Sequence, residues 1–520
     1  MTKFLYSNIN IFDIDKFEFY ETNILIEDGV VSDIGRSINY DKKTEVIDLK
    51  DFYMLPGLVD SHGHMTHLGK NQYEVDLRDC KSEFEVVNKI KTFLDLNKNL
   101  TWVNGGGWNQ EKFDIKLLPD NKYLSMNFPD IPVSLSRIDG HAIWCNKKAL
   151  DMANIQEDTP VPDGGEILKK DGLLTGILVD KAQQLIRNII PTESIEDVKK
   201  WILKAQEICL SKGLTEVHDA GISSIQFEAY KKLINEDKLK IRVYAMANQE
   251  LFENNVSKYK SELFELKSVK LVADGALGSN GAALIEKYQD LDTYGILILD
   301  KNKLQTLFSK AFEDDFQVCI HAIGDKANRE VVLALREVLK KFNGNKFDHR
   351  TRIEHAQIIK EEDIKEISDL NIIASVQPMH CISDMYMAQE RLGDRVKDSY
   401  LWKTLVDNNI LLIGGSDFPV ENPSPLMGIY AAVNRTKFNN SPSGGWQPKE
   451  ILNLKEALEM YTKNTAYGSF KENFKGNIEI GKIADFTLID RDISLLSVDD
   501  ILKCKIVATI VNGEMVYKDF

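Results

Sequence analysis

Two histidines separated by one residue, His62 and His64, follow the short apolar run Met54–Val59. In a β-strand, residues two apart point to the same face. If the run is a strand, both imidazoles project the same way from its end, which suits one metal ion. Two unrelated surface histidines are the alternative, and the presence of further ligands downstream would decide between the two readings.

Further candidate ligands follow other short apolar runs. The chain has nine histidines. Six of them occur where such a run ends, and they are His62, His64, His218, His321, His355 and His380. Asp417 follows another run, and Lys270 lies within one. Neutral imidazoles and carboxylates suit Zn²⁺ and related divalent ions, and a bound ion lowers the pKa of its water to around 7. The set therefore indicates metal-assisted hydrolysis.

The elements that would position these residues alternate between short β-rich runs and helical stretches, the pattern of a parallel α/β fold. The predicted strands are Met54–Val59, Thr215–Val217, Ile241–Tyr244, Val269–Val272, Gln317–Ile320, Arg352–Glu354, Ile372–Val376 and Ile410–Ile413. Eight strand–helix units predict a (β/α)8 TIM-type barrel with active-site groups at the C-terminal strand ends. The candidate ligands occur at such ends.

Both chain ends are rich in short strands separated by turns, such as the Asn512-Gly513 hairpin signal. We expect residues 1–53 and 476–520 to form one small β-sandwich domain, with two separate sheets as the alternative. Residues 54–475 would then be the barrel. Its first connection, about 65–214, is far longer than a usual βα loop, which predicts an inserted subdomain covering the barrel mouth.

Composition narrows the class of protein. The 520 residues are 43% hydrophobic and 28% charged, as in a globular protein. A formal charge of -15 argues against a nucleic-acid partner, and no apolar run approaches the length that crosses a bilayer. Six scattered cysteines fit reduced thiols rather than a disulfide framework. We therefore expect a cytoplasmic enzyme that acts on a small-molecule substrate.

Motifs in the same order along nearly the whole chain resemble the amidohydrolase superfamily, in particular its YtcJ-like branch, amidohydrolase family 3. The motifs are Pro56–His64, Gly105–Trp108, Arg137–His141, Asp274–Ser279, His321–Asp325, Arg352–Ala356, Ser416–Val420 and Gly481–Asp485. The resemblance is specific for the superfamily and its branch, but it does not identify a substrate.

The resemblance implies six metal ligands, which are His62, His64, Lys270, His321, His355 and Asp417. His62 and His64 would hold the more buried ion, and Lys270, carbamylated, would bridge it to a second ion held by His321 and His355. Asp417 would bind metal and act as the general base. A single-ion site is the alternative.

Lys270 decides between one ion and two. It lies within an apolar strand, and a buried lysine loses its proton more easily. Only the neutral amine reacts with CO₂. The alternative is an ordinary lysine paired with a carboxylate such as Asp274.

Four further residues are candidates for substrate binding, and each has a structural alternative. His141 would contact substrate from the insertion or be satisfied within the insertion core. His380 would line the pocket after strand seven. His218 would line the pocket or pack below it, and Trp108 would form an apolar wall or pack in a core, as tryptophan more often does.

The expected function is hydrolysis of a C–N bond, in an amide or an N-substituted formamide. A hydrolytic deaminase or a cyclic-amide hydrolase is the alternative enzyme, and a mononuclear site would favour it. A non-catalytic binding protein is the third hypothesis, which the complete ligand set disfavours. A homodimer is an expectation at the level of the family.

Overall fold

The computed structural model describes residues 3–98, 100–138, 140–342 and 347–520, and divides the chain into two compact units. One unit comprises Met1–Met65 and Ile202–Phe520, and the other comprises Thr66–Trp201. Of the motif residues, Asp139 lies outside the described residues. Among the described helices, none is long and apolar enough to cross a membrane.

The larger unit contains a nearly closed barrel of eight parallel strands, which confirms the predicted fold class. In sheet order, which reverses the chain order, the strands are β20 (Leu412–Gly414), β19 (Ile373–Val376), β18 (Arg352–His355), β17 (Gln317–Ala322), β16 (Phe264–Val272), β14 (Arg242–Asn248), β13 (Leu214–Ile222) and β6 (Leu58–Gly63). Almost every residue of these strands is buried, as expected for parallel strands covered by helices. An isolated bridge between Gly63 and Phe418 joins the first strand to the chain that follows the last.

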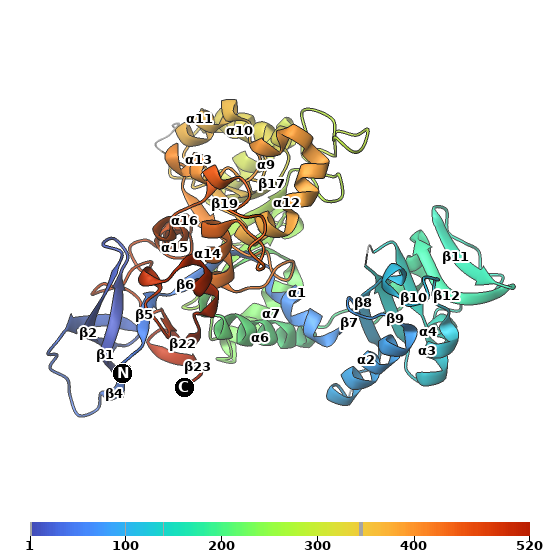
Figure 1. Cartoon of the computed structure of the whole chain (residues 1–520), viewed down its shortest axis with the longest axis horizontal. Helices are drawn as coiled ribbons and strands as arrows, with labels where there is room; N and C mark the ends of the chain where they lie inside the picture. The colour runs from blue at the N-terminus through green and yellow to red at the C-terminus, as the bar shows by residue number, and fades with distance from the viewer. Residues whose placement is uncertain (1–2, 99, 139, 343–346) are drawn as a thin grey trace. The chain divides into compact units, whose positions relative to one another are not determined.

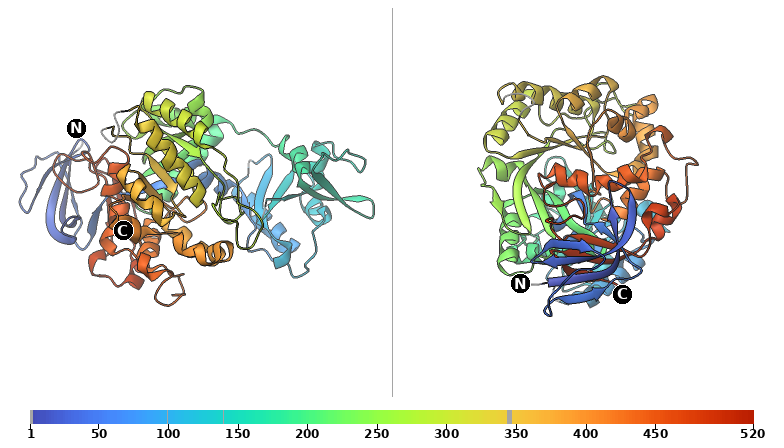
Figure 2. Two further views of the ribbon diagram at one scale, coloured as in Figure 1. Left: turned by 90° about the horizontal axis from the view of Figure 1, so that it is seen from above. Right: turned by 90° about the vertical axis from the view of Figure 1, so that its left-hand side faces the viewer.

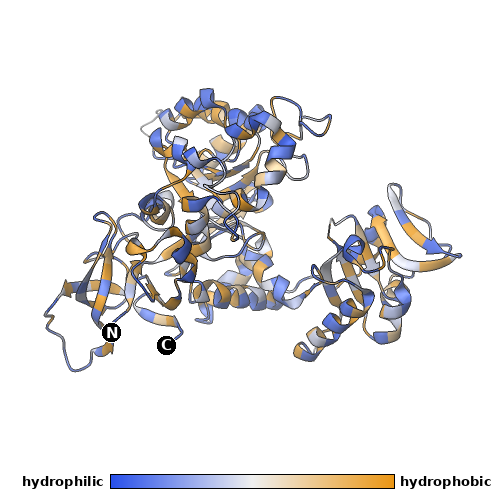
Figure 3. Ribbon diagram, in the orientation of Figure 1, coloured by the Kyte–Doolittle hydropathy of each residue, from blue (hydrophilic) through white to orange (hydrophobic). Residues whose placement is uncertain are grey.

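Helices alternate with the barrel strands and cover them (Figures 1 and 2). They are α6 (Ile195–Ser211), α7 (Ser224–Asn235), α8 (Gln249–Glu253), α9 (Lys301–Glu313), α10 (Asp325–Leu339), α11 (Glu361–Asp369), α12 (Pro378–Leu392), α13 (Trp402–Asp407) and α14 (Pro425–Asn434). In α9 the Asp300 side chain caps the first turn by accepting from the N–H of Lys303. The helices mix hydrophilic and hydrophobic residues, whereas hydrophobic colour prevails along the barrel strands (Figure 3).

The predicted first strand, Met54–Val59, is two strands in the structure. Residues Tyr53–Pro56 form β5, which pairs antiparallel with β21 (Phe486–Ile489) in the terminal sheet, and β6 starts at Leu58 in the barrel. Gly57 separates them, and a Cβ there would lie 2.3 Å from the Thr215 hydroxyl oxygen. The apolar run therefore passes from the terminal sheet to the barrel at Gly57, which has no side chain.

Both chain ends contribute to one eight-stranded sheet. Its order is β23 (Glu514–Lys518), β22 (Ile506–Val511), β21, β5, β1 (Lys3–Asp13), β2 (Glu18–Glu27) and β3 (Val30–Gly35), with β4 (Glu45–Asp48) beside β1. Strands β22 and β23 pair antiparallel around Asn512-Gly513, which confirms the predicted hairpin. Helices α15 (Leu454–Met460) and α16 (Lys463–Gly468) precede β21, where the chain re-enters this sheet.

The smaller unit has a core and sheet of its own. Its strands, in sheet order, are β11 (Gly165–Lys170), β12 (Leu173–Asp180), β10 (Ala142–Cys145), β9 (Val133–Arg137), β8 (Val103–Trp108) and β7 (Val75–Asp76). Helices α2 (Glu83–Leu96), α3 (Asn121–Asn127) and α4 (Lys147–Met152) accompany the sheet, and α1 (Met65–Lys70) begins at the boundary between the units.

Candidate metal centre

The ends of β6 and β20 are held together where the barrel closes. The backbone N–H of Asp417 donates to the carbonyl of His62 at 2.7 Å, and the N–H of His64 donates to the carbonyl of Phe418 at 2.9 Å. Gly415 permits this approach, because a Cβ there would lie 2.6 Å from the backbone nitrogen of His62. The closure thus brings together side chains that lie more than 350 positions apart in the sequence.

A first group of three possible ligands forms at this closure. The Nε2 atom of His64 lies 3.1 Å from Asp417 Oδ1, and the Nε2 atom of His62 lies 3.8 Å from the same oxygen. One ligand atom from each residue falls within 4.8 Å of the other two. The Nε2 atoms of His62 and His64 therefore both face the same carboxylate oxygen.

A second group shares Asp417 and adds His355 and His380. Their ligand atoms also lie within 4.8 Å of one another, and the Nε2 atom of His380 is 3.9 Å from Asp417 Oδ2. His355 ends β18 and His380 lies in the first turn of α12. His355 and Asp417 have φ of +76° and +58°, in the left-handed region that residues other than glycine seldom adopt.

Lys270 and His321 lie beside these groups. The Nζ atom of Lys270 is 2.9 Å from His62 Nε2. The imidazole of His321 is 4.5 Å from that of His355 between ring centroids, and its Nε2 lies 3.5 Å from Asp274 Oδ1. All six predicted ligands thus lie in one region of the barrel unit, and His380 accompanies them.

Asp274, the carboxylate considered as a partner for Lys270, has other contacts. It accepts backbone hydrogen bonds from Ala283, Ile323 and Gly324, and burial raises its pKa to about 7. It holds the loop after β16 against the end of β17. Lys270 instead contacts His62, inside the candidate centre.

The electrostatics of the centre favour the ligand form of each group. Burial, then the charge of Lys270, lowers the pKa of His62 to about 4 and that of His321 to about 3. Burial also lowers the pKa of His355 and of Lys270. Burial alone would raise the pKa of Asp417, but the hydrogen bond with His64 and the nearby histidines hold it well below its usual value. Metal ligands must be deprotonated to bind, and the pKa shifts of these histidines and of Asp417 favour that form.

The residues present fit a divalent cation. Two atoms of the second group, His355 Nδ1 and His380 Nε2, are buried and have no hydrogen-bond partner among the described residues. An unpaired buried polar atom costs free energy on the order of 1–3 kcal/mol, and a coordinated ion would remove that cost. Imidazole and carboxylate donors suit Zn²⁺ and its neighbours in the first transition row.

Two residues next to the centre, Glu354 and Arg352, received no role from the sequence. Glu354 Oε2 lies 2.5 Å from His62 Nδ1, and Glu354 Oε1 lies 2.8 Å from Arg352 Nε. Burial alone would raise the pKa of Glu354, but the charge of Arg352 and the contact with His62 hold it well below its usual value. The signal available in the sequence was a pair of charged residues two apart in a strand expected to be buried on both faces.

His218 and Trp108, two candidates for substrate binding, are both fully buried. His218 lies in the middle of β13, fully buried, between Glu216 and Arg352. Trp108 is fully buried in the core of the smaller unit, and its indole N–H donates to the carbonyl of Leu135 at 2.8 Å. Neither side chain is exposed for contact with a substrate, because neighbours on every side enclose it.

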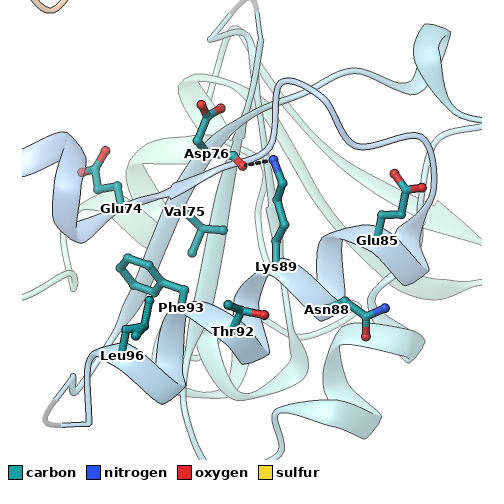
Figure 4. Close-up of a pocket in the computed structure, with 9 residues that line it drawn as sticks. All are labelled: Glu74, Val75, Asp76, Glu85, Asn88, Lys89, Thr92, Phe93 and Leu96. Atoms are coloured by element: carbon teal, nitrogen blue, oxygen red, sulfur yellow. Dashed lines mark hydrogen bonds between the residues drawn. The ribbon is translucent and has the colours of Figure 1, made fainter.

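His141 belongs to the smaller unit, where its side chain is 69% exposed and its Nδ1 lies 2.8 Å from Asp180 Oδ1. A cavity of about 490 Å³ in that unit lies between β7 and α2 (Figure 4). Lys89 crosses it to donate to the carbonyl of Asp76 at 2.9 Å. A second cavity of about 800 Å³ includes Phe84, Ile115 and Leu117. None of the predicted site residues lines either cavity.

Comparison with solved structures agrees with this architecture. A crystal structure of a metal-dependent hydrolase from Pyrococcus furiosus superimposes with a TM-score of 0.77 at 28% sequence identity, covering 94% of this chain and 99% of the other. A second metal-dependent hydrolase, from Pyrococcus horikoshii, superimposes with a TM-score of 0.78 at 27% identity, over 96% of this chain and 99% of the other.

Sequence comparison extends the likeness to proteins of bacteria. YtcJ of Bacillus subtilis is 35% identical over 511 residues, which are 95% of this chain and 96% of YtcJ. An N-substituted formamide deformylase of Arthrobacter pascens is 24% identical over 542 aligned positions, covering 98% of this chain and 97% of the deformylase. The model of the Amidohydrolase family matches residues 45–517. The chain therefore belongs to the amidohydrolase family, whose solved relatives include metal-dependent hydrolases.

Proposed function

We propose that this protein is a metal-dependent hydrolase of C–N bonds in amides or N-substituted formamides. The observation that carries the proposal is the pair of three-residue groups that share Asp417. Support for the substrate class comes from the similarity to the formamide deformylase over nearly the whole of both chains. The substrate would be a small molecule, and the buried, unpaired cysteines support a cytoplasmic location.

His62, His64 and Asp417 would hold one divalent ion, for which we propose zinc, and His355 with His321 would hold a second. Such an ion supplies Lewis acidity and brings the pKa of a bound water to around 7. Lys270 would join the two ions after its neutral amine adds to CO₂, forming an N–C bond and releasing one proton. Its burial and its place 2.9 Å from His62 Nε2 support that role.

Asp417 would act as the general base. Its carboxylate is held ionised beside four histidines, so it can accept a proton from the attacking water. The same carboxyl group would then give that proton to the leaving nitrogen as the C–N bond breaks. Proton transfer by a positioned side chain contributes roughly 10²- to 10⁴-fold to rate.

The test begins with elemental analysis of full-length protein purified without chelator. We expect one or two equivalents of zinc or a neighbouring transition metal, lost on dialysis against chelator and restored on addition of zinc. Protein that neither retains nor binds such a metal would refute the metal-dependent reading. Zinc-loaded protein is then assayed on N-formyl and N-acyl amines and on cyclic amidines, with formate, acid or ammonia release as readouts. Turnover of the cyclic amidines alone would make the deaminase alternative correct and the proposed substrate class wrong.

A further inference from the structure

A chain of buried charged side chains runs beneath the candidate metal centre, and the proposed hydrolysis does not use it. Its members are His62, Glu354, Arg352, His218, Glu216 and Lys475. Each is at most 6% exposed in its side chain. Burying charges is costly unless they are paired. A chain of six buried side chains, each in contact with the next, therefore needs a functional or structural explanation.

Arg352 sets the direction of the hydrogen bonds that it makes, because a guanidinium only donates. Its Nη1 donates to His218 Nδ1 at 2.8 Å, and its Nε pairs with Glu354 Oε1 at 2.8 Å. Its Nη2 donates to the carbonyl of Ser61 at 2.6 Å, next to His62. Because Arg352 only donates, His218 Nδ1 must accept, and the ion pair with Arg352 keeps Glu354 as a carboxylate, which has only acceptors.

The consequence for His62 is a single tautomer. Glu354 Oε2 lies 2.5 Å from His62 Nδ1, and a carboxylate paired with Arg352 has only acceptors to offer. The ring proton therefore lies on Nδ1. The lone pair lies on Nε2, the nitrogen that faces Lys270 and Asp417. In the other tautomer the proton would lie on Nε2 and block coordination.

On its other side, Arg352 contacts His218, and this part of the chain leads away from the metal centre and helps to balance the charge of Arg352. With Nδ1 accepting from Arg352, His218 carries its proton on Nε2, which is 3.1 Å from Glu216 Oε1. The other oxygen of Glu216 pairs with Lys475. Two cations and two anions thus alternate along the chain, so that the guanidinium of Arg352 is held in place without net charge.

We propose that Glu354 and Arg352 are positioning residues that fix His62 in the tautomer able to bind metal. Glu354 would act directly on His62 Nδ1, and Arg352 would act through Glu354 and through the backbone of Ser61. The inference rests on the proposed metal dependence. Partners of this kind orient metal-binding histidines and typically change metal affinity by about 10- to 100-fold when altered.

The first test measures the tautomer in the full-length protein labelled with ¹⁵N-histidine. One-bond N–H coupling in the NMR spectrum identifies the protonated ring nitrogen, and His62→Asn assigns the signal. We expect the proton on Nδ1 both in zinc-loaded protein and after removal of metal. A proton on Nε2 in the metal-free protein would overturn the proposal without any variant.

The second test compares two isosteric variants, Glu354→Gln and Glu216→Gln. Each replaces a buried glutamate that lies between a histidine and a cation, but only Glu354 contacts His62. A glutamine at 354 has one acceptor oxygen for two donors. Because Arg352 cannot accept, the amide nitrogen would face His62 Nδ1 and force its proton onto Nε2. Both variants are expected to lose thermal stability.

Zinc affinity, measured by competition with a chromogenic chelator, separates the two variants. We expect Glu354→Gln to weaken zinc binding about 10- to 100-fold and Glu216→Gln to change it less than about threefold. Equal zinc affinity in folded Glu354→Gln and wild type would overturn the proposal, and so would equal losses in both variants. Wild-type protein that binds no zinc would refute the proposed function instead, while the tautomer in metal-free protein would still decide this inference.

Discussion

The carboxylate of Asp60 accepts a 2.6 Å hydrogen bond from the hydroxyl of Ser416, which ties the strand that carries His62 to the loop that carries Asp417. The same carboxylate accepts from the backbone N–H groups of Ser416 and His62. It is fully enclosed, and burial raises its pKa to about 7. This one side chain therefore fixes the spacing of the two halves of the first ligand group.

Replacement of Asp60 by alanine and by asparagine should have different effects. Asp60→Ala leaves the buried N–H groups of His62 and Ser416 unpaired, at a cost of about 2–4 kcal/mol in the free energy of unfolding. Asp60→Asn retains an acceptor oxygen for them, and its amide can donate to the Ser416 hydroxyl. We expect a loss below about 1 kcal/mol for asparagine, measured by urea denaturation. Equal losses in both variants would contradict this account of the closure.

Removal of the proposed base should greatly lower turnover while the protein stays folded. Asp417→Asn keeps the shape of the side chain but cannot accept the proton, so we expect kcat to fall roughly 10²- to 10⁴-fold on an amide substrate. Asp363→Asn, which removes a carboxylate paired with Arg329, is the matched control and should retain wild-type kcat. Full turnover by Asp417→Asn would exclude Asp417 as the base.

Lys270→Ala should lower the number of bound zinc ions from two to one if the carbamate joins them. Added acetate should restore the second ion in part, because a free carboxylate can occupy the position of the lost carbamate. Lys267→Ala alters a lysine on the same strand that lies over Phe470 instead, and its zinc content should equal that of wild type. Two ions in Lys270→Ala without acetate would rule out a bridging role.

His380 is expected to contribute to the second metal position, because it belongs to the group with His355 and Asp417 and its Nε2 lies 3.9 Å from Asp417 Oδ2. His380→Asn should reduce zinc bound at that position, as measured by titration calorimetry, and leave the His62 group occupied. His141→Asn, in the smaller unit, serves as a control for loss of a histidine. Identical titrations for His380→Asn and wild type would limit His380 to lining the pocket.

Acid should destabilise the fold through His349, which lies outside the metal centre. Burial lowers its pKa from 6.5 to about 4. Between these two pH values the side chain is protonated in the unfolded chain and neutral in the folded protein. Stability from this residue is complete above pH 6.5 and decreases as the pH falls to 4, by about 3 kcal/mol in total. His349 Nε2 donates to the carbonyl of Leu370 at 3.0 Å, and Nδ1 accepts from the N–H of Thr351 at 2.9 Å, so a second ring proton would break the bond from Thr351.

His349→Gln removes the titrating group. The difference in unfolding free energy between wild type and His349→Gln should therefore shrink by about 3 kcal/mol from pH 7 to pH 4. A difference that stays constant over this range would mean that His349 keeps its ordinary pKa in the folded protein.

Much of the fold could be predicted because its signals are local. Eight apolar runs, each bounded by turns and separated by helical stretches, specify strands wherever the chain places them. The exception is Met54–Val59, which the structure divides at Gly57 between two sheets. Its length and hydrophobicity are those of one strand. Only the pairing of β5 with β21, more than 400 residues away, shows where it divides.

The sequence by itself predicted which candidate residues follow the barrel strands, since strand periodicity and the carboxyl ends of parallel strands place side chains without knowledge of distant contacts. The family resemblance supplied their expected roles as metal ligands. The tertiary structure alone decided which other groups contact these residues. Glu354 lies 292 positions from His62 and meets it only across the barrel interior. The burial of Trp108 likewise depends on neighbours from other strands. A contact between residues far apart in the chain has no local signal, because it is created by the closure of the barrel and the packing of the core.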